Sequence, residues 1–180
     1  MSFPTLTVTN AGKSLILAAM AMTTEETTHT VKFTRVKIGN GAAPSNIAAM
    51  TDIVNQLDTA PITGFERETN SVTVTFLYDH SGVEAAFSWK EVGLFARLDD
   101  DTTTETLFAY ANAGSDAETV PASSGSFYEE NTYNLEIIVD NVDNLSATVK
   151  SLTYASKEDF DEFVARTDNP HQVTKAQVGL

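Results

Sequence analysis

The sequence contains no cysteine, which excludes several kinds of chemistry. Disulfide bonds, thiolate metal sites and cysteine nucleophiles all require that residue. The three histidines, His29, His80 and His171, lie far apart, and no two of them have the spacing of a known metal-binding motif. We therefore expect solvent-facing or structural roles for the histidines, and we expect no metal ion or other cofactor.

Basic residues are scarce, with 11 lysines and arginines against 25 acidic residues and a formal net charge of −14. The imbalance is concentrated in residues 41–149, where three basic residues accompany eighteen acidic ones, a net charge of −15. Affinity for nucleic acid comes from lysine and arginine that replace the counterions of phosphate. The composition therefore argues against a nucleic-acid partner, and we attribute the acidity to solubility.

Long hydrophobic runs are missing. The apolar run Leu15–Met22 is much shorter than the roughly 20 residues that a membrane-spanning helix needs. It is also short for the core of a signal peptide, and polar residues such as Thr9 and Asn10 precede it. We expect neither membrane insertion nor a cleaved leader.

Motifs of catalysis are missing as well. Gly39-Asn-Gly41 does not continue into the glycine pattern of a dinucleotide site, and no serine lies in a Gly-x-Ser-x-Gly motif. Asp99-Asp-Asp101 lacks the alternating pattern of a calcium loop. In so acidic a chain, no pair of carboxylates can be singled out as a glycosidase pair. We expect that the protein is not an enzyme.

The stretch Val83–Arg97 holds the only tryptophan and alternates apolar with small or polar residues, which is typical of half-buried strands. We interpret it as the central strands of an antiparallel sheet. The second of these strands places Phe95 on the face opposite to Leu94, and Gly93 inside it indicates a bulge or a close approach of another group.

Other segments complete an α+β fold. Further strands are expected over 31–38, 72–78, 107–110, 133–139 and 147–152, and the apolar phase shift within 31–38 indicates either a bulge or burial on both faces. Asn10 is expected to cap a helix over 11–22. This helix is apolar on most faces, so we expect it to be buried in its own domain or against a partner. Helical spacing of Ile47, Met50, Val54 and Leu57 predicts a second, amphipathic helix. The expected architecture is two helices packed on an antiparallel sheet or sandwich of about six strands, with connections over 61–70 and 112–131.

The character of the chain changes after Tyr154. Phe160, Phe163 and Val164 fall on one stripe of a helix of about three turns, which is too short to be stable alone and so needs a partner surface. Thr174 begins a second helix, with Val173 and Val178 spaced as a hydrophobic staple. We expect this short C-terminal helical segment to continue past Leu180 or to be continued by a partner.

Several segments resemble one protein family. The stretches 9–19 (TNAGKSLILAA), 33–41 (FTRVKIGNG), 89–96 (WKEVGLFA) and 107–112 (LFAYAN) resemble, in this order, the N-terminal domain of phage tail-collar fibre proteins. Residues 168–180 (DNPHQVTKAQVGL) resemble a motif of phage and prophage tail fibres that stands where a shaft begins or repeats. The first resemblance extends over residues 5–153.

The resemblance implies a structural protein at the base of a tail fibre, which attaches a host-recognition fibre to the baseplate of a contractile tail or tail-like particle. It implies an arm and helix over 1–22, a β-rich attachment domain over 23–153 and a trimerisation segment over 154–180 that leads to the shaft. The expected location is the virion tail or an extracellular particle, assembled in the bacterial cytoplasm. Receptor binding would belong to a more C-terminal part of the fibre.

The resemblance also assigns candidate contact residues. The candidates for the baseplate contact are Phe3, Leu6, Leu15, Ile16 and Met20. The candidates for contacts within a homotrimer are Phe160, Phe163, Val164, Val173 and Val178, which three-fold symmetry would bring together in a small hydrophobic bundle.

Two other classes of function remain open. A carbohydrate-binding or adhesin-like β-domain would need a groove of exposed aromatic residues, for which Tyr110, Phe127, Tyr128 and Tyr133 are available. A hydrolase of cell-wall or capsule polymer ranks below it. We rank both below the tail-fibre function.

Overall fold

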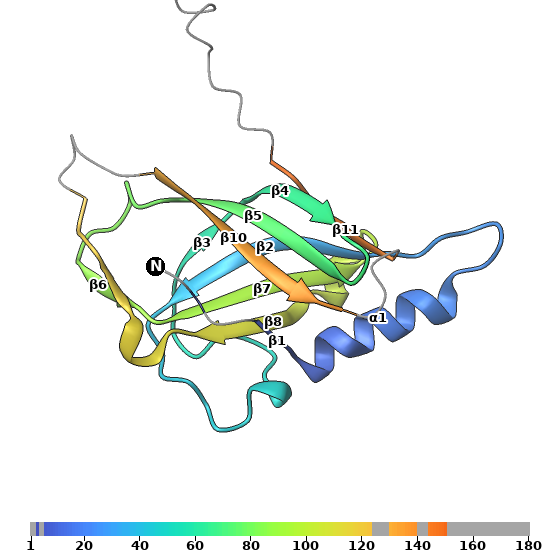
Figure 1. The fold of residues 1–180 in the computed structure, drawn as a ribbon, viewed down its shortest axis with the longest axis horizontal. Helices are drawn as coiled ribbons and strands as arrows, with labels where there is room; N and C mark the ends of the chain where they lie inside the picture. Colours follow the sequence, from blue (N-terminus) through green and yellow to red (C-terminus); the bar gives the residue numbers. More distant parts are fainter. Residues whose placement is uncertain (1–2, 4–5, 124–129, 140–143, 151–180) are drawn as a thin grey trace, which may run out of the picture. The chain divides into compact units, whose positions relative to one another are not determined.

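Two mostly antiparallel sheets packed face to face form the frame of the molecule in the computed structural model (Figure 1). The structure describes residues 3, 6–123, 130–139 and 144–150, which belong to one compact unit, Met1–Lys150. The larger sheet contains, in spatial order, β1 (Thr7–Val8), β8 (Thr106–Asn112), β7 (Glu91–Leu98), β2 (Val31–Gly39) and β11 (Leu145–Ala147), and β3 (Gln56–Ala60) also pairs with β2. The smaller sheet contains β10 (Glu130–Ile138), β5 (Ser71–Asp79) and β4 (Ile62–Arg67).

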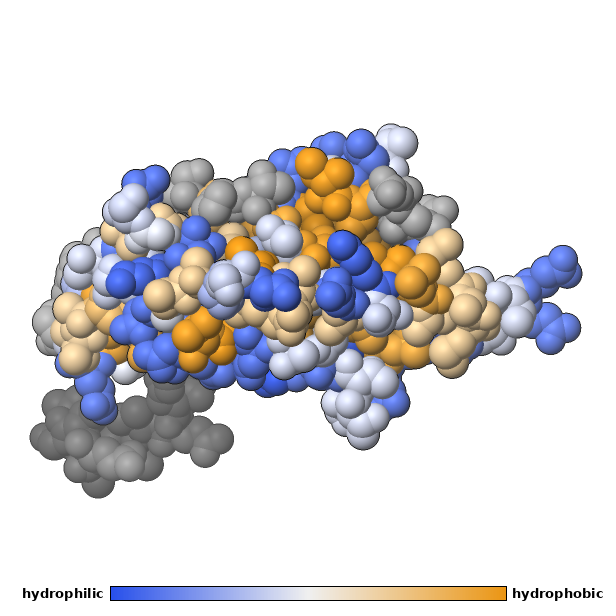
Figure 2. Space-filling view, turned by 90° about the horizontal axis from the view of Figure 1, so that it is seen from below, coloured by the Kyte–Doolittle hydropathy of each residue, from blue (hydrophilic) through white to orange (hydrophobic). Residues whose placement is uncertain are grey.

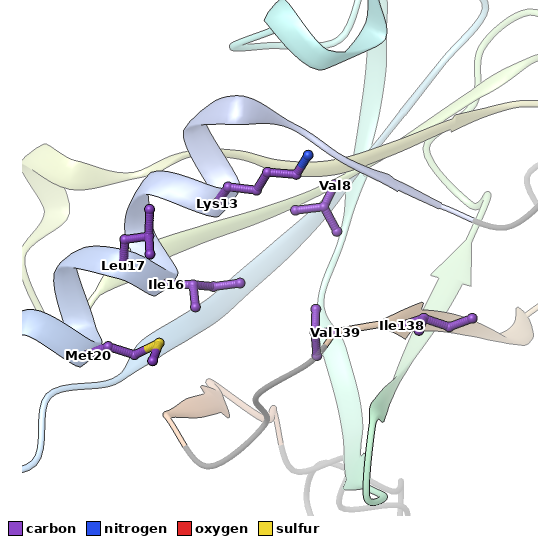
Figure 3. Close-up of a pocket in the computed structure, with 7 residues that line it drawn as sticks. All are labelled: Val8, Lys13, Ile16, Leu17, Met20, Ile138 and Val139. Atoms are coloured by element: carbon purple, nitrogen blue, oxygen red, sulfur yellow. The ribbon is translucent and has the colours of Figure 1, made fainter.

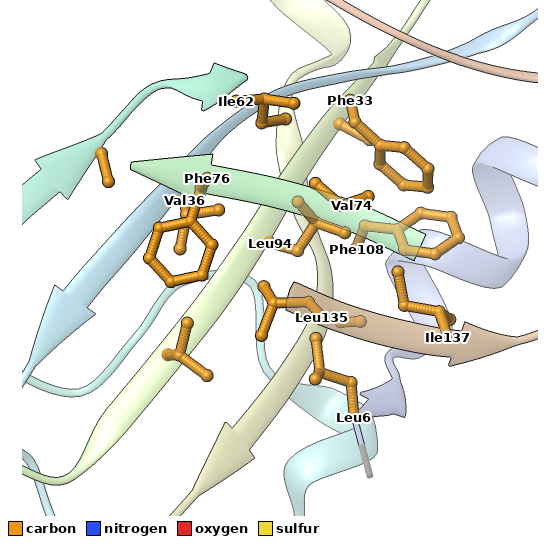
Figure 4. Close-up of a cluster of buried hydrophobic side chains, with 14 of the residues drawn as sticks. Leu6, Phe33, Val36, Ile62, Val74, Phe76, Leu94, Phe108, Leu135 and Ile137 are labelled. Atoms are coloured by element: carbon orange, nitrogen blue, oxygen red, sulfur yellow. The ribbon is translucent and has the colours of Figure 1, made fainter. Parts of the chain in front are cut away.

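The core lies between the two sheets. Large apolar side chains from both sheets point toward one another across this space, among them Phe33 and Phe108 from the larger sheet and Phe76 and Ile137 from the smaller one (Figure 4). Period-two alternation puts these side chains on the inner faces, and burial of several such residues supplies most of the stability of a domain of this size. The predicted strands over 72–78 and 133–139 are confirmed as β5 and β10.

The phase shift predicted in β2 is a bulge. The register between β2 and β7 shifts between Phe33 and Arg35, so that Val31 and Phe33 before the bulge and Val36 and Ile38 after it are all fully buried. Phe95 lies on the opposite face of β7 from Leu94, as predicted, and belongs to a second small core with Ile53, Leu107 and Tyr110.

The helix α1 (Asn10–Met22) forms where it was predicted, but its cap is Thr9 and not Asn10. The Thr9 hydroxyl accepts a hydrogen bond from the Gly12 amide at 3.0 Å and donates one to the Leu107 carbonyl at 2.6 Å. Thr9 follows β1 directly, and its own amide donates to the carbonyl of Phe108 in β8. The start of the helix is thus set by pairing with a strand about a hundred residues away, which local sequence does not reveal.

The prediction of a second helix is wrong. Ile47–Ala49 forms a single 3-10 turn, and Gln56–Ala60 is the strand β3. The amides of Val54 and Asn55 donate to the Glu91 carboxylate of β7, at 2.9 and 2.7 Å, instead of to helical carbonyls. These distant partners outweigh a helical pattern that has no strong propensity behind it.

Other predicted boundaries change as well. The stretch Val83–Arg97 does not form adjacent strands of one sheet: β7 is central in the larger sheet, but β6 (Phe87–Trp89) pairs with β9 (Glu118–Val120) in a separate ladder. The expected connection over 61–70 contains β4, and the expected loop over 112–131 contains β9 and one 3-10 turn, Gly114–Asp116; another, Thr102–Thr104, precedes β8. In the described part of the chain there are eleven strands, more than the roughly six expected; four of them are only two or three residues long, and β3 and β4 lie in segments that were expected to be a helix and a connection.

One side of the sandwich is closed by the chain itself. β3 belongs to the larger sheet and continues through Pro61 into β4 of the smaller one. Among the described strands, β11 alone runs parallel to its neighbour. After β11, the Thr148 amide donates to the Phe33 carbonyl of the larger sheet and the Lys150 amide donates to the Ile62 carbonyl of the smaller sheet, both at 2.8 Å. On the opposite side the edges of the two sheets are β1 and β10. None of the described helices is long and apolar enough to span a membrane.

Candidate functional site

An apolar groove lies where α1, β1 and the end of β10 meet (Figure 3). It has a volume of about 470 Å³, and we call it the helix groove. Helix side chains lie on one side of it, and Val139 and Ile138 lie on the other (Figure 3). Its lining consists of Val8, Lys13, Ile16, Leu17, Met20, Ile138 and Val139.

The groove exposes large apolar side chains to solvent. Leu17 is 65% exposed, Met20 45% and Ile138 62%. Seen from below, orange side chains gather over the helix on this face of the molecule (Figure 2). Single exposed apolar residues are ordinary on a protein surface, whereas several around one hollow are typical of a protein–protein contact.

The packing of α1 explains why these residues remain exposed. Its buried residues are Gly12, Leu15 and Ala19, which face the core. Gly12 allows a close approach, since a Cβ atom there would collide with the backbone carbonyl of Phe108 in β8. Because the helix is apolar on most faces, burying this narrow stripe leaves Leu17 and Met20 unburied.

The structure separates the five residues predicted for the baseplate contact. Leu6 and Leu15 are buried in the core, and the half-buried Phe3 packs edge-on against Trp89 with ring centroids 5.3 Å apart. Ile16 is half-buried and Met20 is exposed, and both line the helix groove. Only these two are brought together in a surface that a partner can reach.

Sequence reasoning missed Leu17 and Ile138, the two most exposed apolar residues of the groove. A signal for Ile138 was present, because it is an apolar residue on the outward side of a strand whose inward positions Leu135, Ile137 and Val139 were recognised. The five residues predicted for the trimer contact lie outside the described residues.

The aromatic residues considered for a carbohydrate site do not form an exposed groove in the described part of the chain. Tyr110 is fully buried. Tyr133 is half-buried, stacks on Phe76 with ring centroids 5.4 Å apart, and meets Trp89 edge-on at 5.0 Å. Phe127 and Tyr128 lie outside the described residues.

The most conspicuous polar group in the core is Glu91, which the sequence did not single out. Its side chain is fully buried, and its carboxylate accepts hydrogen bonds from the amides of Gly41, Val54 and Asn55 at 2.7–2.9 Å and from the Tyr110 hydroxyl at 3.0 Å. Burial is the main cause that raises the pKa of Tyr110, to about 12; the Asn112 amide opposes this, and the Glu91 charge adds to it. With all its bonds made and no solvent contact, Glu91 holds the 40–55 loop against β7 and β8.

A second pair of ionisable residues, His29 and Asp99, joins the loop that follows α1 to the connection between β7 and β8. His29 Nδ1 lies 2.7 Å from the Asp99 carboxylate, which also accepts from the Thr30 amide at 2.8 Å. Burial acts to raise the pKa of Asp99, but these hydrogen bonds and the nearby His29 outweigh it and lower the pKa. Within the described ranges, no group of three or more histidine or acidic side chains is placed to hold a metal ion.

Comparison of the chain with protein-family models, curated proteins and solved structures found no match. The case for a function therefore depends on the residues themselves.

Proposed function

We propose that this chain is the base of a tail fibre, and that it attaches a host-recognition fibre to the baseplate of a contractile phage tail or tail-like particle. The observation that carries the proposal is the helix groove, because an exposed apolar hollow on an otherwise well-packed domain favours a protein partner. The groove also coincides with a segment of the family resemblance. Residues 9–19, which resemble tail-collar fibre proteins, include Lys13, Ile16 and Leu17 of the groove lining.

The proposed partner at the groove is a baseplate protein. The proposed mechanism is mechanical, and the strength of attachment comes from the apolar area buried at the contact. Lys13 is the one charged residue among those that line the groove, so the contact depends mainly on shape and apolar burial.

The proposal includes three copies of the chain. In this proposal the apolar stripe of Phe160, Phe163 and Val164 joins the three copies. The assembled fibre belongs to the virion tail or to an extracellular particle, and nucleic acid and membrane are not among its partners.

The test is co-sedimentation with fibre-less contractile particles from the bacterial strain that encodes the chain. We expect the full chain to sediment with these particles and Met20→Asp to lose most of that binding, because a charge in the groove must be desolvated there. Leu57→Asp is a matched control, since Leu57 is 44% exposed against 45% for Met20 and lies on β3, away from the groove lining. Equal binding by both variants, or no binding by the unmodified chain, would refute the proposal.

A further inference from the structure

In the described part of the chain, the smaller sheet ends in an open edge, which lies beside the helix groove. Among the described strands, β10 pairs with β5 alone, over all nine residues Glu130–Ile138. The opposite side of the sandwich is closed by the β3–β4 connection and by residues 148–150. An edge strand of this length presents a row of backbone donors and acceptors to which another strand can add.

The register shows which backbone groups face the open edge. The Val139 amide donates to the Asn70 carbonyl at 2.9 Å, in register with the β10–β5 ladder. Because hydrogen-bonded and non-bonded pairs alternate between antiparallel strands, the odd-numbered residues of β10 bond to β5. The even-numbered residues turn their amides and carbonyls to the open edge and their side chains to solvent. These residues are Glu130, Thr132, Asn134, Glu136 and Ile138.

The outward face beside this edge is acidic. Glu136 of β10 and Glu66 of β4 stand on either side of Thr73 in β5, and Glu130 stands opposite Asp79. Glu66, Asp79, Glu130 and Glu136 are all exposed, and none of the outward positions of these three strands holds a lysine or arginine. A strand added to β10 would place its own outward side chains directly beside Glu130 and Glu136, where lysine or arginine is favoured.

The end of the edge strand has the opposite character. Ile138 is outward and exposed, and it lines the helix groove together with Leu17 and Met20 of α1. A residue of an added strand opposite Ile138 therefore meets apolar side chains on two sides. The edge therefore favours a particular sequence in the added strand: an apolar residue at the end beside α1 and basic residues along the rest.

We propose that β10 binds an extended segment of a partner protein by strand addition, with a large apolar residue of that segment in the helix groove and basic residues beside Glu136 and Glu130. A second copy of this chain is disfavoured as the occupant, because its own β10 would bring more carboxylates to an acidic face. The identification of the partner as a baseplate protein rests on the proposed function, whereas the strand addition itself does not.

The experiment uses two ten-residue peptides of alternating valine and threonine. The first has leucine at its first outward position and lysine at its second and fifth, so that antiparallel addition places leucine opposite Ile138 and the lysines opposite Glu136 and Glu130. The second has glutamate in place of both lysines. Fluorescence anisotropy measures the affinity of each labelled peptide for the full chain, and hydrogen–deuterium exchange locates the amides that become protected.

We expect the lysine peptide to bind about tenfold more tightly than the glutamate peptide and to slow amide exchange within Glu130–Ile138. Glu136→Lys should weaken binding of the lysine peptide by about fivefold or more. Glu66→Lys changes the same charge in the same row but lies two strands from the open edge, roughly 14 Å from the added strand, where salt screens most of the effect. It should alter the affinity less than about twofold.

The inference fails if the lysine peptide leaves exchange in β10 unchanged at millimolar concentration, if both lysine variants weaken it equally, or if the free chain already pairs through β10 with a second copy. None of these measurements involves a tail particle. Failure of strand addition is therefore distinguishable from failure of the proposed attachment function.

Discussion

Replacing Glu91 with glutamine should destabilise the domain strongly, although the change is nearly isosteric. The carboxylate accepts four hydrogen bonds in a site without solvent contact, two at Oε1 from Gly41 and Asn55 and two at Oε2 from Val54 and Tyr110. An amide can preserve the two at one position only. At the other, its NH2 group faces the Val54 amide, donor against donor.

The magnitude follows from the bonds that are lost. A hydrogen bond to a charged group contributes about 1.5–3 kcal/mol, and leaving a buried donor unsatisfied costs about 1–3 kcal/mol. We therefore expect Glu91→Gln to lower the free energy of unfolding by about 2–4 kcal/mol, or Tm by roughly 5–15 °C for a domain of this size. Tyr110→Phe removes only the hydroxyl bond at 3.0 Å and should cost less, about 1 kcal/mol.

The assay is thermal and urea unfolding followed by circular dichroism and by the fluorescence of Trp89, the only tryptophan. Glu136→Gln makes the same chemical change at an exposed position and should stay within about 0.5 kcal/mol of the unmodified protein. If Glu91→Gln also stays within that range, the carboxylate does not hold the 40–55 loop in the way described.

Three further predictions concern α1, the His29–Asp99 pair and the assembly. Gly12→Ala should lower stability by about 1–3 kcal/mol, despite the better helix propensity of alanine, because its methyl group meets the Phe108 backbone; thermal unfolding showing a gain would contradict this packing. Asp99→Asn should reduce stability near neutral pH. Folding lowers the pKa of Asp99, so this residue stabilises the fold above its unfolded pKa, and the stabilisation is lost as pH falls through its folded pKa. The stabilities of Asp99→Asn and of the unmodified protein should therefore converge in acid. A stability difference that is constant with pH would count against this prediction. Light scattering should give a trimer for residues 1–180 and a smaller species for Phe163→Asp or for a chain that ends at Thr153; a trimeric Phe163→Asp would place the contact elsewhere.

Much of the sheet structure was accessible from the sequence because strand periodicity is local. The alternation in β5 and β10, the phase shift that becomes the β2 bulge and the opposite orientation of Phe95 all depend on residues only two to five positions apart. Gly93 was recognised for the same reason, and a Cβ atom at Gly93 would indeed collide with Ile53.

The failures share a different cause. Ile47, Met50 and Val54 have helical spacing, but the amides of this segment are bound by Glu91, about forty residues further along the chain. The helix is capped by Thr9 and not by the predicted Asn10, and the Thr9 hydroxyl is held in place by its hydrogen bond to the Leu107 carbonyl. Neither partner can be identified from local pattern or propensity.

The candidate site could be predicted only in part from the sequence. An N-terminal helix that is apolar on most faces indicated burial in the domain or against a partner; Leu15 is indeed buried in the domain, Met20 is exposed, and burial of Met20 against a partner stays a prediction. The groove itself required knowing that the end of β10 comes beside α1, which is a tertiary relation. Ile138 belongs to the site only because it lies beside α1.

The most direct test of the central claim is site-specific photocrosslinking in assembled particles. A photoreactive leucine analogue at position 17 should link the chain to a baseplate protein, identified by mass spectrometry, whereas the same analogue at position 57 should not. A baseplate crosslink from position 57 and none from position 17 would contradict attachment through the helix groove.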